Sequence, residues 1–199
     1  MSNFHVAGFS KNDVLAHLMS RQSHWPLHLP APNDEELHLA FEVAMRAPDH
    51  TNLRPWRFIV IRDEALVRLG DVFEGAAIKR NATDNGKRSR SQAMAAPMII
   101  AVGAACVFNA SVPRIEQIIS AGAAAMNLLN ALHLLNYGAY WASGDNAYDS
   151  NVINALGLNA ETDHLLGFIY VGSPVKPQRE KARPSSNDFV TRWNSFSAQ

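Results

Sequence analysis

Apolar residues recur along the chain at two spacings, which predict helices alternating with strands. Leu37, Phe41, Ala44 and Met45 follow the three-to-four-residue spacing of one helix face. Trp56–Arg62 is instead a short run of β-branched and aromatic residues, typical of a strand. The same criteria predict helices at 10–21, 63–79, 113–137 and 151–156, and strands at 98–105, 139–142 and 164–171. Such intermixing indicates an α/β or α+β fold.

Two predicted helices begin at residues suited to capping. Ser10 with Asp13 is a variant of the capping box, and Asn33 with Glu36 has the same three-residue spacing. The cap side chain accepts a bond from an otherwise unpaired backbone N–H in the first turn. These pairs therefore place helix starts near residues 10 and 33.

The longest predicted helix, 113–137, is apolar nearly all round. Pro113 suits its first position and Gly138 the position after its end. At about 1.5 Å per residue it would be more than 30 Å long. Polar residues interrupt the apolar run too often for a membrane span, at Ser120, Asn127, Asn130 and His133. A single small domain does not easily cover such a helix, so a second copy of the chain is expected to pack on it.

Two polar segments stand between or after these elements. Residues 79–92 contain an Asn-Gly step and are expected to form an exposed loop or a mobile lid. Residues 177–199 are broken by prolines yet carry Phe189, Val190 and Trp193. We expect one domain over residues 1–199, with a C-terminal arm from about 177 that docks on its own domain or wraps a partner.

Composition excludes several classes of function. Lys plus Arg and Asp plus Glu are both 18, so the basic excess typical of nucleic-acid binding is absent. Cys106 is the single cysteine, which suits a reducing cytoplasm and predicts a buried small apolar residue. The sequence contains no Rossmann, Walker A or G-x-S-x-G motif and no metal-ligand spacing. His24 and His28 are interpreted as surface histidines, and no secretory signal is recognised at the N-terminus.

Residues 45–56, Met-Arg-Ala-Pro-Asp-His-Thr-Asn-Leu-Arg-Pro-Trp, are the strongest candidate for a ligand-binding loop. They connect a helix to a strand, and loops on rigid scaffolds often hold ligands. His50 and Asn52 can donate to and accept from the edge of a heterocycle. The pattern alone is equally compatible with a simple connection that binds nothing.

The same stretch resembles the helix-end motif of the nitroreductase family, Ala-Pro-Ser-x-x-Asn-x-Gln-Pro-Trp-x-Phe. Four further elements agree with that family in chain order, namely Arg21-Gln22-Ser23, Val112-Pro113-Arg114-x-Glu116-Gln117, Trp141-Ala142-Ser143-Gly144, and Gly167 to Pro174 with Lys181-Ala182-Arg183. The chain most resembles the small YdjA-type branch of NAD(P)H nitroreductases. The resemblance implies a three-layer fold with a mostly antiparallel central sheet and the long helix at a homodimer interface.

The resemblance also implies an FMN cofactor, held by both subunits. Arg21, Gln22 and Ser23 are expected at its phosphate and ribityl end, and Lys181 and Arg183 would add cationic contacts to the phosphate. Arg46, His50 and Asn52 belong to the loop motif, and the first two are expected to serve the flavin of the other subunit. Trp141, Ala142 and Ser143 are expected along the flavin, near its reactive N5 edge.

The implied activity is hydride transfer from NADH or NADPH, through flavin N5, to a nitroaromatic, a quinone or a similar acceptor. The flavin carries the hydride, so no catalytic side chain is expected. Gln22 and Ala142 stand where the family has arginines, which keeps a non-catalytic flavin- or partner-binding module as an alternative. Flavin fragmentation and reductive dehalogenation are further alternatives within the superfamily.

Each implied residue also has a purely structural interpretation. Arg21 could be a cation at a helix C-terminus, Trp141 could pack in the core, and Glu116 could be a first-turn partner of the helix dipole. Lys181 and Arg183 could belong to a solvated basic tail.

Overall fold

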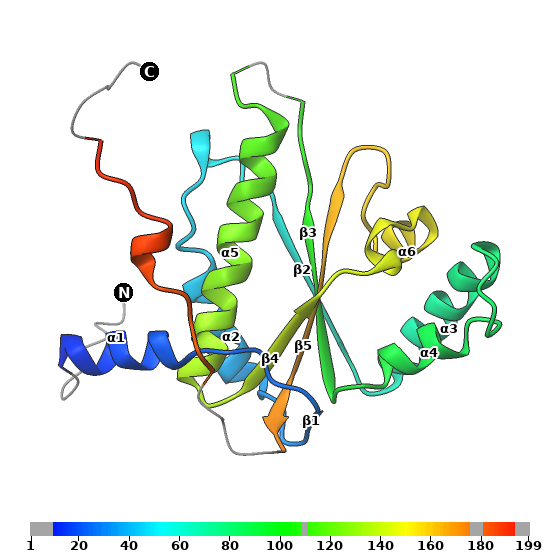
Figure 1. The fold of residues 1–199 in the computed structure, drawn as a ribbon. Helices are drawn as coiled ribbons and strands as arrows, with labels where there is room; N and C mark the ends of the chain where they lie inside the picture. The colour runs from blue at the N-terminus through cyan, green and yellow to red at the C-terminus, as the bar shows by residue number, and fades with distance from the viewer. Residues whose placement is uncertain (1–9, 109–110, 176–180, 194–199) are drawn as a thin grey trace.

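The structure is a computed structural model that describes residues 10–108, 111–175 and 181–193. Within these residues, five strands form one antiparallel sheet with the order β1-β5-β3-β2 and with β4 paired to β5 (Figure 1). The strands are β1 Leu27–His28, β2 Trp56–Arg62, β3 Met98–Ala104, β4 Gly138–Ala142 and β5 His164–Pro174. The α+β class and the antiparallel sheet are confirmed.

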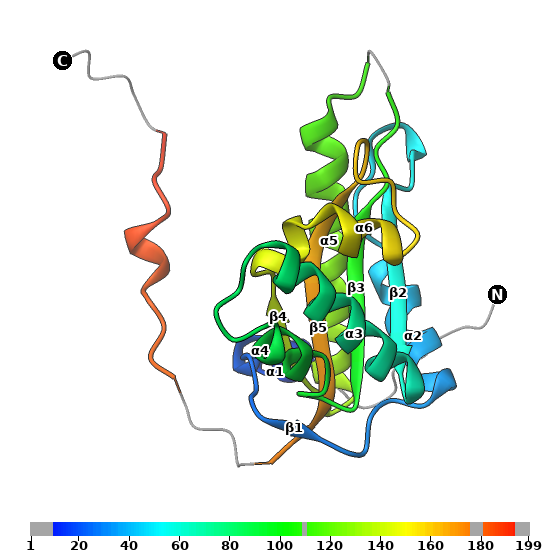
Figure 2. The same ribbon diagram turned by 90° about the vertical axis from the view of Figure 1, so that its right-hand side faces the viewer.

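Helices cover both faces of the sheet (Figures 1 and 2). Their bounds are α1 Lys11–Ser20, α2 Asp34–Ala44, α3 Glu64–Lys79, α4 Lys87–Ala93, α5 Arg114–Leu134 and α6 Ser150–Ala155. Short 3-10 turns lie at η1 His50–Asn52, η2 Asp145–Tyr148 and η3 Ser186–Asp188. The two predicted capping boxes, at Ser10 and Asn33, are both present.

Strand β3 divides its side chains between two apolar cores. Met98, Ile100 and Val102 face the core formed with α2 and α5. Ile99 and Ala101 face the core formed with α3 and α6. Because successive side chains alternate across a strand, a strand buried on both faces must be apolar throughout. This explains the uninterrupted apolar run in its sequence.

The predicted loop at 79–92 is wrong in its second half, where α4 forms. Asp84 accepts hydrogen bonds from the backbone N–H of Gly86 and Arg88, and Gly86 adopts a left-handed φ of 77°. Arg90 then pairs with Asp71 and Glu74 of α3. The helix buries a single residue, Ala93, so it carries no apolar periodicity to detect.

Two predicted boundaries of the long helix are also corrected. Pro113 is the residue before the helix rather than its first residue. Asn136, with φ 65°, takes the left-handed position expected of Gly138. Gly138 instead begins β4, where an added Cβ would lie 2.7 Å from Cδ2 of Leu27. Its small size serves strand packing and not helix termination.

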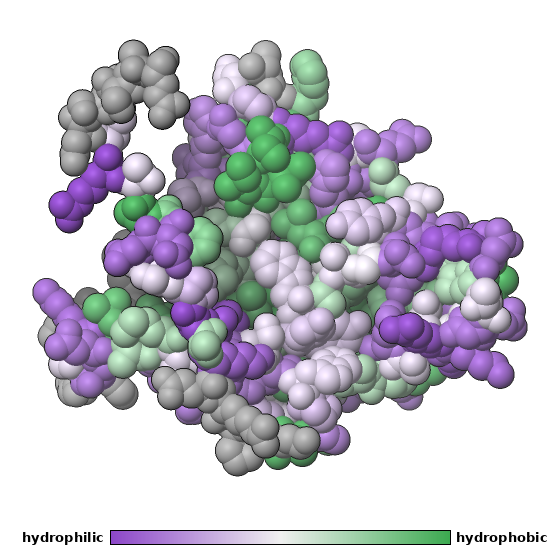
Figure 3. Space-filling model, in the orientation of Figure 1, coloured by the Kyte–Doolittle hydropathy of each residue, from purple (hydrophilic) through white to green (hydrophobic). Residues whose placement is uncertain are grey.

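Helix α5 leaves an apolar stripe on its outer side. Ile115 and Ile119 are 59% and 62% exposed, and Met126 and Leu134 also reach solvent. Figure 3 shows a hydrophobic patch over the upper part of this helix. Among the described residues, no helix is long and apolar enough to span a bilayer.

The described part of the C-terminal arm stands away from the domain (Figure 2). Residues 181–193 are all exposed, Phe189 and Val190 among them. Arg183 Nη2 nevertheless donates to the backbone oxygen of Arg21 at 3.0 Å. The arm therefore does not bury its apolar residues on its own domain in this region.

Gly167 provides a test of the β4–β5 pairing. An added Cβ would lie 2.5 Å from the backbone oxygen of Ala142, and φ is already +127°. We expect Gly167→Ala to lower the free energy of unfolding by more than about 3 kcal/mol.

Gly157 is the matched control, with φ +80° and nothing within 4 Å of its Cβ position. Gly157→Ala should cost only about 1–2 kcal/mol. Equal losses in urea titrations would show that the contact with Ala142 is unimportant.

Candidate active site

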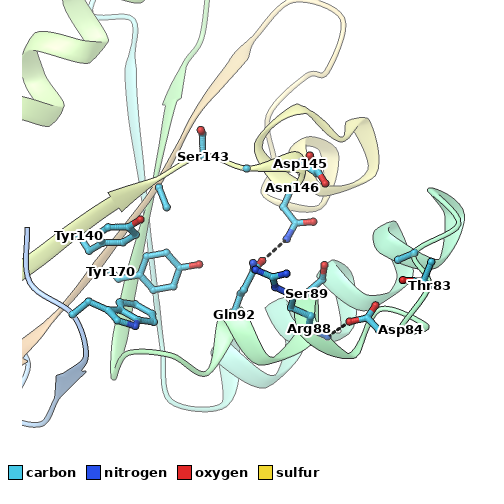
Figure 4. A pocket seen from close by; sticks show the side chains of 14 residues that line it. Thr83, Asp84, Arg88, Ser89, Gln92, Tyr140, Ser143, Asp145, Asn146 and Tyr170 are labelled. Atoms are coloured by element: carbon cyan, nitrogen blue, oxygen red, sulfur yellow. Dashed lines mark hydrogen bonds between the residues drawn. The ribbon is translucent and has the colours of Figure 1, made fainter.

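A cavity of about 1000 Å³ opens between the end of β4 and helix α4 (Figure 4). One wall is formed by β4 and η2, and the other by α4 and the turn before it. Its lining residues are Trp25, Ala82, Thr83, Asp84, Arg88, Ser89, Gln92, Tyr140, Ala142, Ser143, Gly144, Asp145, Asn146 and Tyr170. The volume is ample for a heteroaromatic ligand.

Three aromatic side chains gather at one side of this cavity. The ring of Trp25 lies 5.5 Å from that of Tyr140 and 5.6 Å from that of Tyr170, the latter edge-on. Burial, followed by the nearby Tyr140, raises the pKa of Tyr170 to about 12. The Tyr170 phenol therefore stays neutral at physiological pH. The group offers a planar, largely apolar surface against which a flat ring can pack.

A polar network joins the two walls of the cavity. Arg80 binds Asp149 and donates to Oδ1 of Asn146 at 2.8 Å, and Nδ2 of Asn146 donates to Gln92 Oε1 at 3.4 Å. Burial opposes ionisation of Asp149, but hydrogen bonds from Asn151 and Arg80 outweigh it and lower its pKa. An ionised Asp149 thus holds Arg80 in place, and Arg80 connects α3 to the residues that line the cavity.

The predicted element Trp141-Ala142-Ser143 divides between the two faces of the sheet. Ala142 and Ser143 line the cavity. The Trp141 indole packs against the core on the other face and donates to the Leu166 oxygen at 3.1 Å. The side chain of Trp141 therefore packs in the core, and only the backbone of Trp141 follows the cavity wall.

A group of cations lies beside β4, at the end of α1. The backbone N–H of His24 donates to the Ala139 oxygen at 3.1 Å, which lays this segment along the strand. Partial burial, then Arg183, lowers the pKa of Arg21. Partial burial, then Lys181 and Arg21, lowers the pKa of His24. In the described residues, no carboxylate forms an ion pair with Arg21, Lys181 or Arg183. Such a concentration of uncompensated charge suits an anion.

The other residues of the predicted Arg21-Gln22-Ser23 element differ in accessibility. Gln22 is buried, at 7% exposed, whereas Ser23 is exposed. His24 is half-buried and thus less accessible than expected of a surface histidine, while His28 is exposed as expected. Cys106 is also only half-buried.

The predicted loop motif forms a separate, well-defined structure at the other end of α5 (Figure 1). Ser120 Oγ donates to the Pro48 oxygen at 2.7 Å, and Asp49 accepts from the backbone N–H of Arg54 at 2.6 Å. Asn52 has a left-handed φ of 57°.

Two side-chain pairs lie on this loop. His50 Nδ1 lies 2.7 Å from Glu116 Oε2. Arg46 forms a long, exposed ion pair with Glu42.

Helix α5 keeps this loop apart from the cation group within one chain. Glu116 contacts the loop, whereas the ring of His133 packs on that of His17 of α1, with ring centres 4.4 Å apart and the planes tilted by 37°. At about 1.5 Å per residue, Glu116 and His133 are about 25 Å apart along the helix axis. A single chain therefore does not bring His50 and Arg21 together.

Sequence and structure comparisons agree on one family. The sequence model of the nitroreductase family matches residues 18–173. YdjA of Escherichia coli K12, provisionally named an NAD(P)H nitroreductase, is 38% identical over 181 residues, which are 90% of this chain and 98% of YdjA. The chain belongs to the nitroreductase family. It is accordingly an oxidoreductase.

Solved structures show the same nitroreductase fold. A nitroreductase-like protein from Bacillus cereus superposes with a TM-score of 0.82 at 20% identity, over 95% of this chain and all of that one. A provisionally named nitroreductase from Desulfovibrio desulfuricans, solved in complex with FMN, gives 0.69 at 25% identity, over 92% and 98% of the two chains. The three-layer fold inferred from the motifs is thereby confirmed.

Several residues of this nitroreductase's cavity escaped the sequence analysis. Tyr140 could have been found, because it lies two residues before Ala142 and thus on the same face of β4. Trp25 and Tyr170 carry no such signal, since they come from distant segments. Arg88 carries no signal either, because the polar sequence around it predicts a loop.

The pair of stacked imidazoles provides a test by pH. Nε2 of each ring lies 3.0–3.1 Å from the other residue's backbone oxygen. Burial, then His17, His24 and Arg21, lowers the pKa of His133 below its ordinary 6.5. The unfolded chain therefore binds more protons than the folded chain below about pH 6.5, and stability falls as the pH decreases from there.

We expect His133→Gln, which keeps a neutral donor, to reduce the fall in Tm between pH 7.5 and pH 5.5. The difference should be about 1–2 °C, because partial exposure screens the effect. His28→Gln, at an exposed histidine on β1, should leave the fall unchanged. A His133→Gln protein with the wild-type pH response would contradict the assignment.

Proposed function

We propose that this nitroreductase works as a homodimer that binds FMN at the subunit interface. In this proposal it transfers hydride from NADH or NADPH to a nitroaromatic, a quinone or a similar acceptor. The observation that carries the proposal is the continuity between the cation group at Arg21 and the aromatic-walled cavity at Tyr140. The segment that contains both Arg21 and Trp25 runs along β4 and joins the two.

The cation group fits the phosphate of FMN. Arg21, Lys181 and Arg183 concentrate positive charge where no carboxylate of the described chain neutralises it. A phosphate dianion would accept charge-assisted hydrogen bonds there and offset the repulsion between Arg21 and Arg183, which adds to the effect of burial in lowering the pKa of Arg21. Ser23 is exposed and adds a hydroxyl donor. Gln22 is buried and would act through the segment's packing.

The cavity fits the ring system of FMN. Reduced flavin carries negative charge near N1 and the C2 oxygen, so a donor placed there favours reduction. Arg88 is the cation among the residues that line the cavity. Ala142, Ser143 and Gly144 bring backbone groups to the opposite wall. When bound, FMN supplies the hydride chemistry, and the chain's residues orient the ring and set its environment.

Three features support the homodimer. The apolar stripe of α5, containing Ile115 and Ile119, is exposed in the single chain. The described arm has apolar residues that do not pack on its own domain. His50 and Arg21 lie toward opposite ends of α5. An antiparallel second copy would cover the stripe and bring His50 and Arg46 of one chain toward the cation group of the other.

A non-catalytic flavin-binding module is the second candidate. Gln22 and Ala142, where the family has arginines, favour it because they remove two cations from the site.

Anaerobic titration separates the two candidates. We expect the purified protein to be yellow with FMN, to be bleached by NADH or NADPH, and to regain colour on addition of a nitroaromatic. Bound FMN that no nicotinamide reduces would favour the module, and failure to bind FMN would contradict both.

Arg21→Ala tests the phosphate site. Loss of a charge-assisted contact should weaken FMN binding about 10- to 100-fold. Arg68→Ala is the matched control, since Arg68 is exposed on α3 and its partner Glu64 is 3.8 Å away. Fluorescence titration of the apoprotein measures both dissociation constants. Unchanged affinity in Arg21→Ala would remove Arg21 from the proposed site.

Ile119→Asp tests the interface. A carboxylate at the centre of an apolar contact has no partner, so we expect the dimer to dissociate at micromolar concentration. Light scattering should then give the monomer mass of 21.9 kDa instead of twice that value. Ile78→Asp, at a 45% exposed site on α3, should leave the dimer intact. A wild-type protein that is already monomeric would refute the shared site.

A further inference from the structure

An imidazole–carboxylate pair lies on the loop motif, outside the hydride chemistry described above. His50 Nδ1 is 2.7 Å from Glu116 Oε2, and the two side chains are 54% and 45% exposed. Glu116 is in the first turn of α5, and Ser120, one turn later, holds the Pro48 oxygen at 2.7 Å. Two residues of one rigid helix thus fix both the loop and its histidine.

The partner on Nδ1 determines the state of the ring. An ionised carboxylate only accepts hydrogen bonds, so Nδ1 must be the donor. Neutral His50 therefore carries its proton on Nδ1 and presents the lone pair of Nε2, while the imidazolium presents Nε2–H. Within the described chain, Nε2 has no hydrogen-bond partner. It is free to release a proton outward and to regain one from water.

The neighbouring polar groups are poorly suited to this task. Asp49 is occupied by the backbone N–H of Arg54 at 2.6 Å. Arg46 is paired with Glu42. His50 is therefore the group on this loop that combines an exposed side chain with a ring nitrogen unoccupied in the described chain.

We propose that the His50–Glu116 pair supplies the proton that completes reduction of the acceptor at the other subunit's site. This rests on the proposed function, which brings His50 of one subunit to the flavin of the other. Two-electron reduction of a quinone to a hydroquinone adds one hydride and one proton. FMN, when bound and reduced, would supply the hydride. His50 Nε2–H gives its proton to the quinone oxygen that becomes the second hydroxyl, and water then reprotonates the imidazole.

In this arrangement His50 is the proton donor and Glu116 is a positioning residue. Glu116 holds the ring with Nε2 outward and stabilises the imidazolium before transfer. The Glu116→Gln variant should leave His50 in place on the loop. It removes the negative charge that keeps the proton of neutral His50 on Nδ1. His50→Gln removes the exchangeable proton while keeping an amide of similar size.

Acceptors that differ in proton demand provide the first test. At saturating FMN and NADPH, we expect His50→Gln to slow benzoquinone reduction about 100-fold and Glu116→Gln about 10-fold. Ferricyanide takes up one electron and no proton, so His50→Gln should slow its reduction at least about tenfold less than it slows benzoquinone reduction. Glu35→Gln, a first-turn acid exposed on α2, should affect neither acceptor. Equal slowing of both acceptors would overturn the proton role while leaving the flavin function intact.

NMR of the apoprotein provides a test that needs no cofactor or turnover. The ring nitrogens of neutral His50 should show the Nδ1–H tautomer in wild type, whereas free imidazole side chains favour Nε2–H. Glu116→Gln should shift that balance, and Glu35→Gln should not. A wild-type His50 with the Nε2–H tautomer would overturn the pair whether or not FMN binds. Loss of all FMN binding together with an intact Nδ1–H signal would refute the proposed function and, with it, the proton transfer.

Discussion

The pairing of β5 with three other strands is the interaction on which the rest of the structure depends. Along its length β5 meets β3 at residues 164–171, β4 at 168–172 and β1 at 173–174. Its alternating side chains enter both cores, with Ile169 on the α5 side and Phe168 on the α3 side. Since β4 is held only through β5 in this sheet, the same pairing sets the cavity wall. Gly167 allows the close approach of Ala142, and Tyr170 then reaches the cavity from the same strand.

The second constraint is the length of α5. It carries the contacts of the loop motif near Glu116 and those of α1 near His133, so one chain holds the two groups of candidate site residues far apart. A helix is stiff over this distance, and bending cannot bring the groups together. The loop motif is nonetheless ordered by its own contacts, and Arg21 is placed by the segment that runs along β4, before any partner arrives. A two-fold arrangement across the apolar stripe would therefore leave only the arm to be fixed, which costs less entropy than ordering a whole site on binding.

Sequence patterns predicted most of the strands and helices because those elements are determined locally. Capping at Ser10 and Asn33, and the apolar run of β3, depend only on neighbouring residues. Helix α4 could not be found this way, since a tertiary ion pair of Arg90 with α3 holds a polar segment. The cavity was equally hidden, because Trp25, Tyr140 and Tyr170 meet only after strand pairing. The family motifs indicated which segments to expect at the candidate site, but not that the side chain of Trp141 faces the opposite core.

The two missing arginines show how the site's charge is distributed. The side chain at position 22 is buried, and an unpaired cation there would be costly to desolvate. Ala142 ends at Cβ and leaves the cavity wall open. Positive charge comes instead from outside the sheet, from Arg88 on α4 and from Lys181 and Arg183 on the arm. The arm touches its own domain through Arg183 at Arg21, yet it exposes its apolar side chains. If those apolar side chains bind a second chain, the binding would also fix the positions of Lys181 and Arg183 on the arm. Cofactor affinity would then depend on dimer formation through the arm as well as through the loop motif.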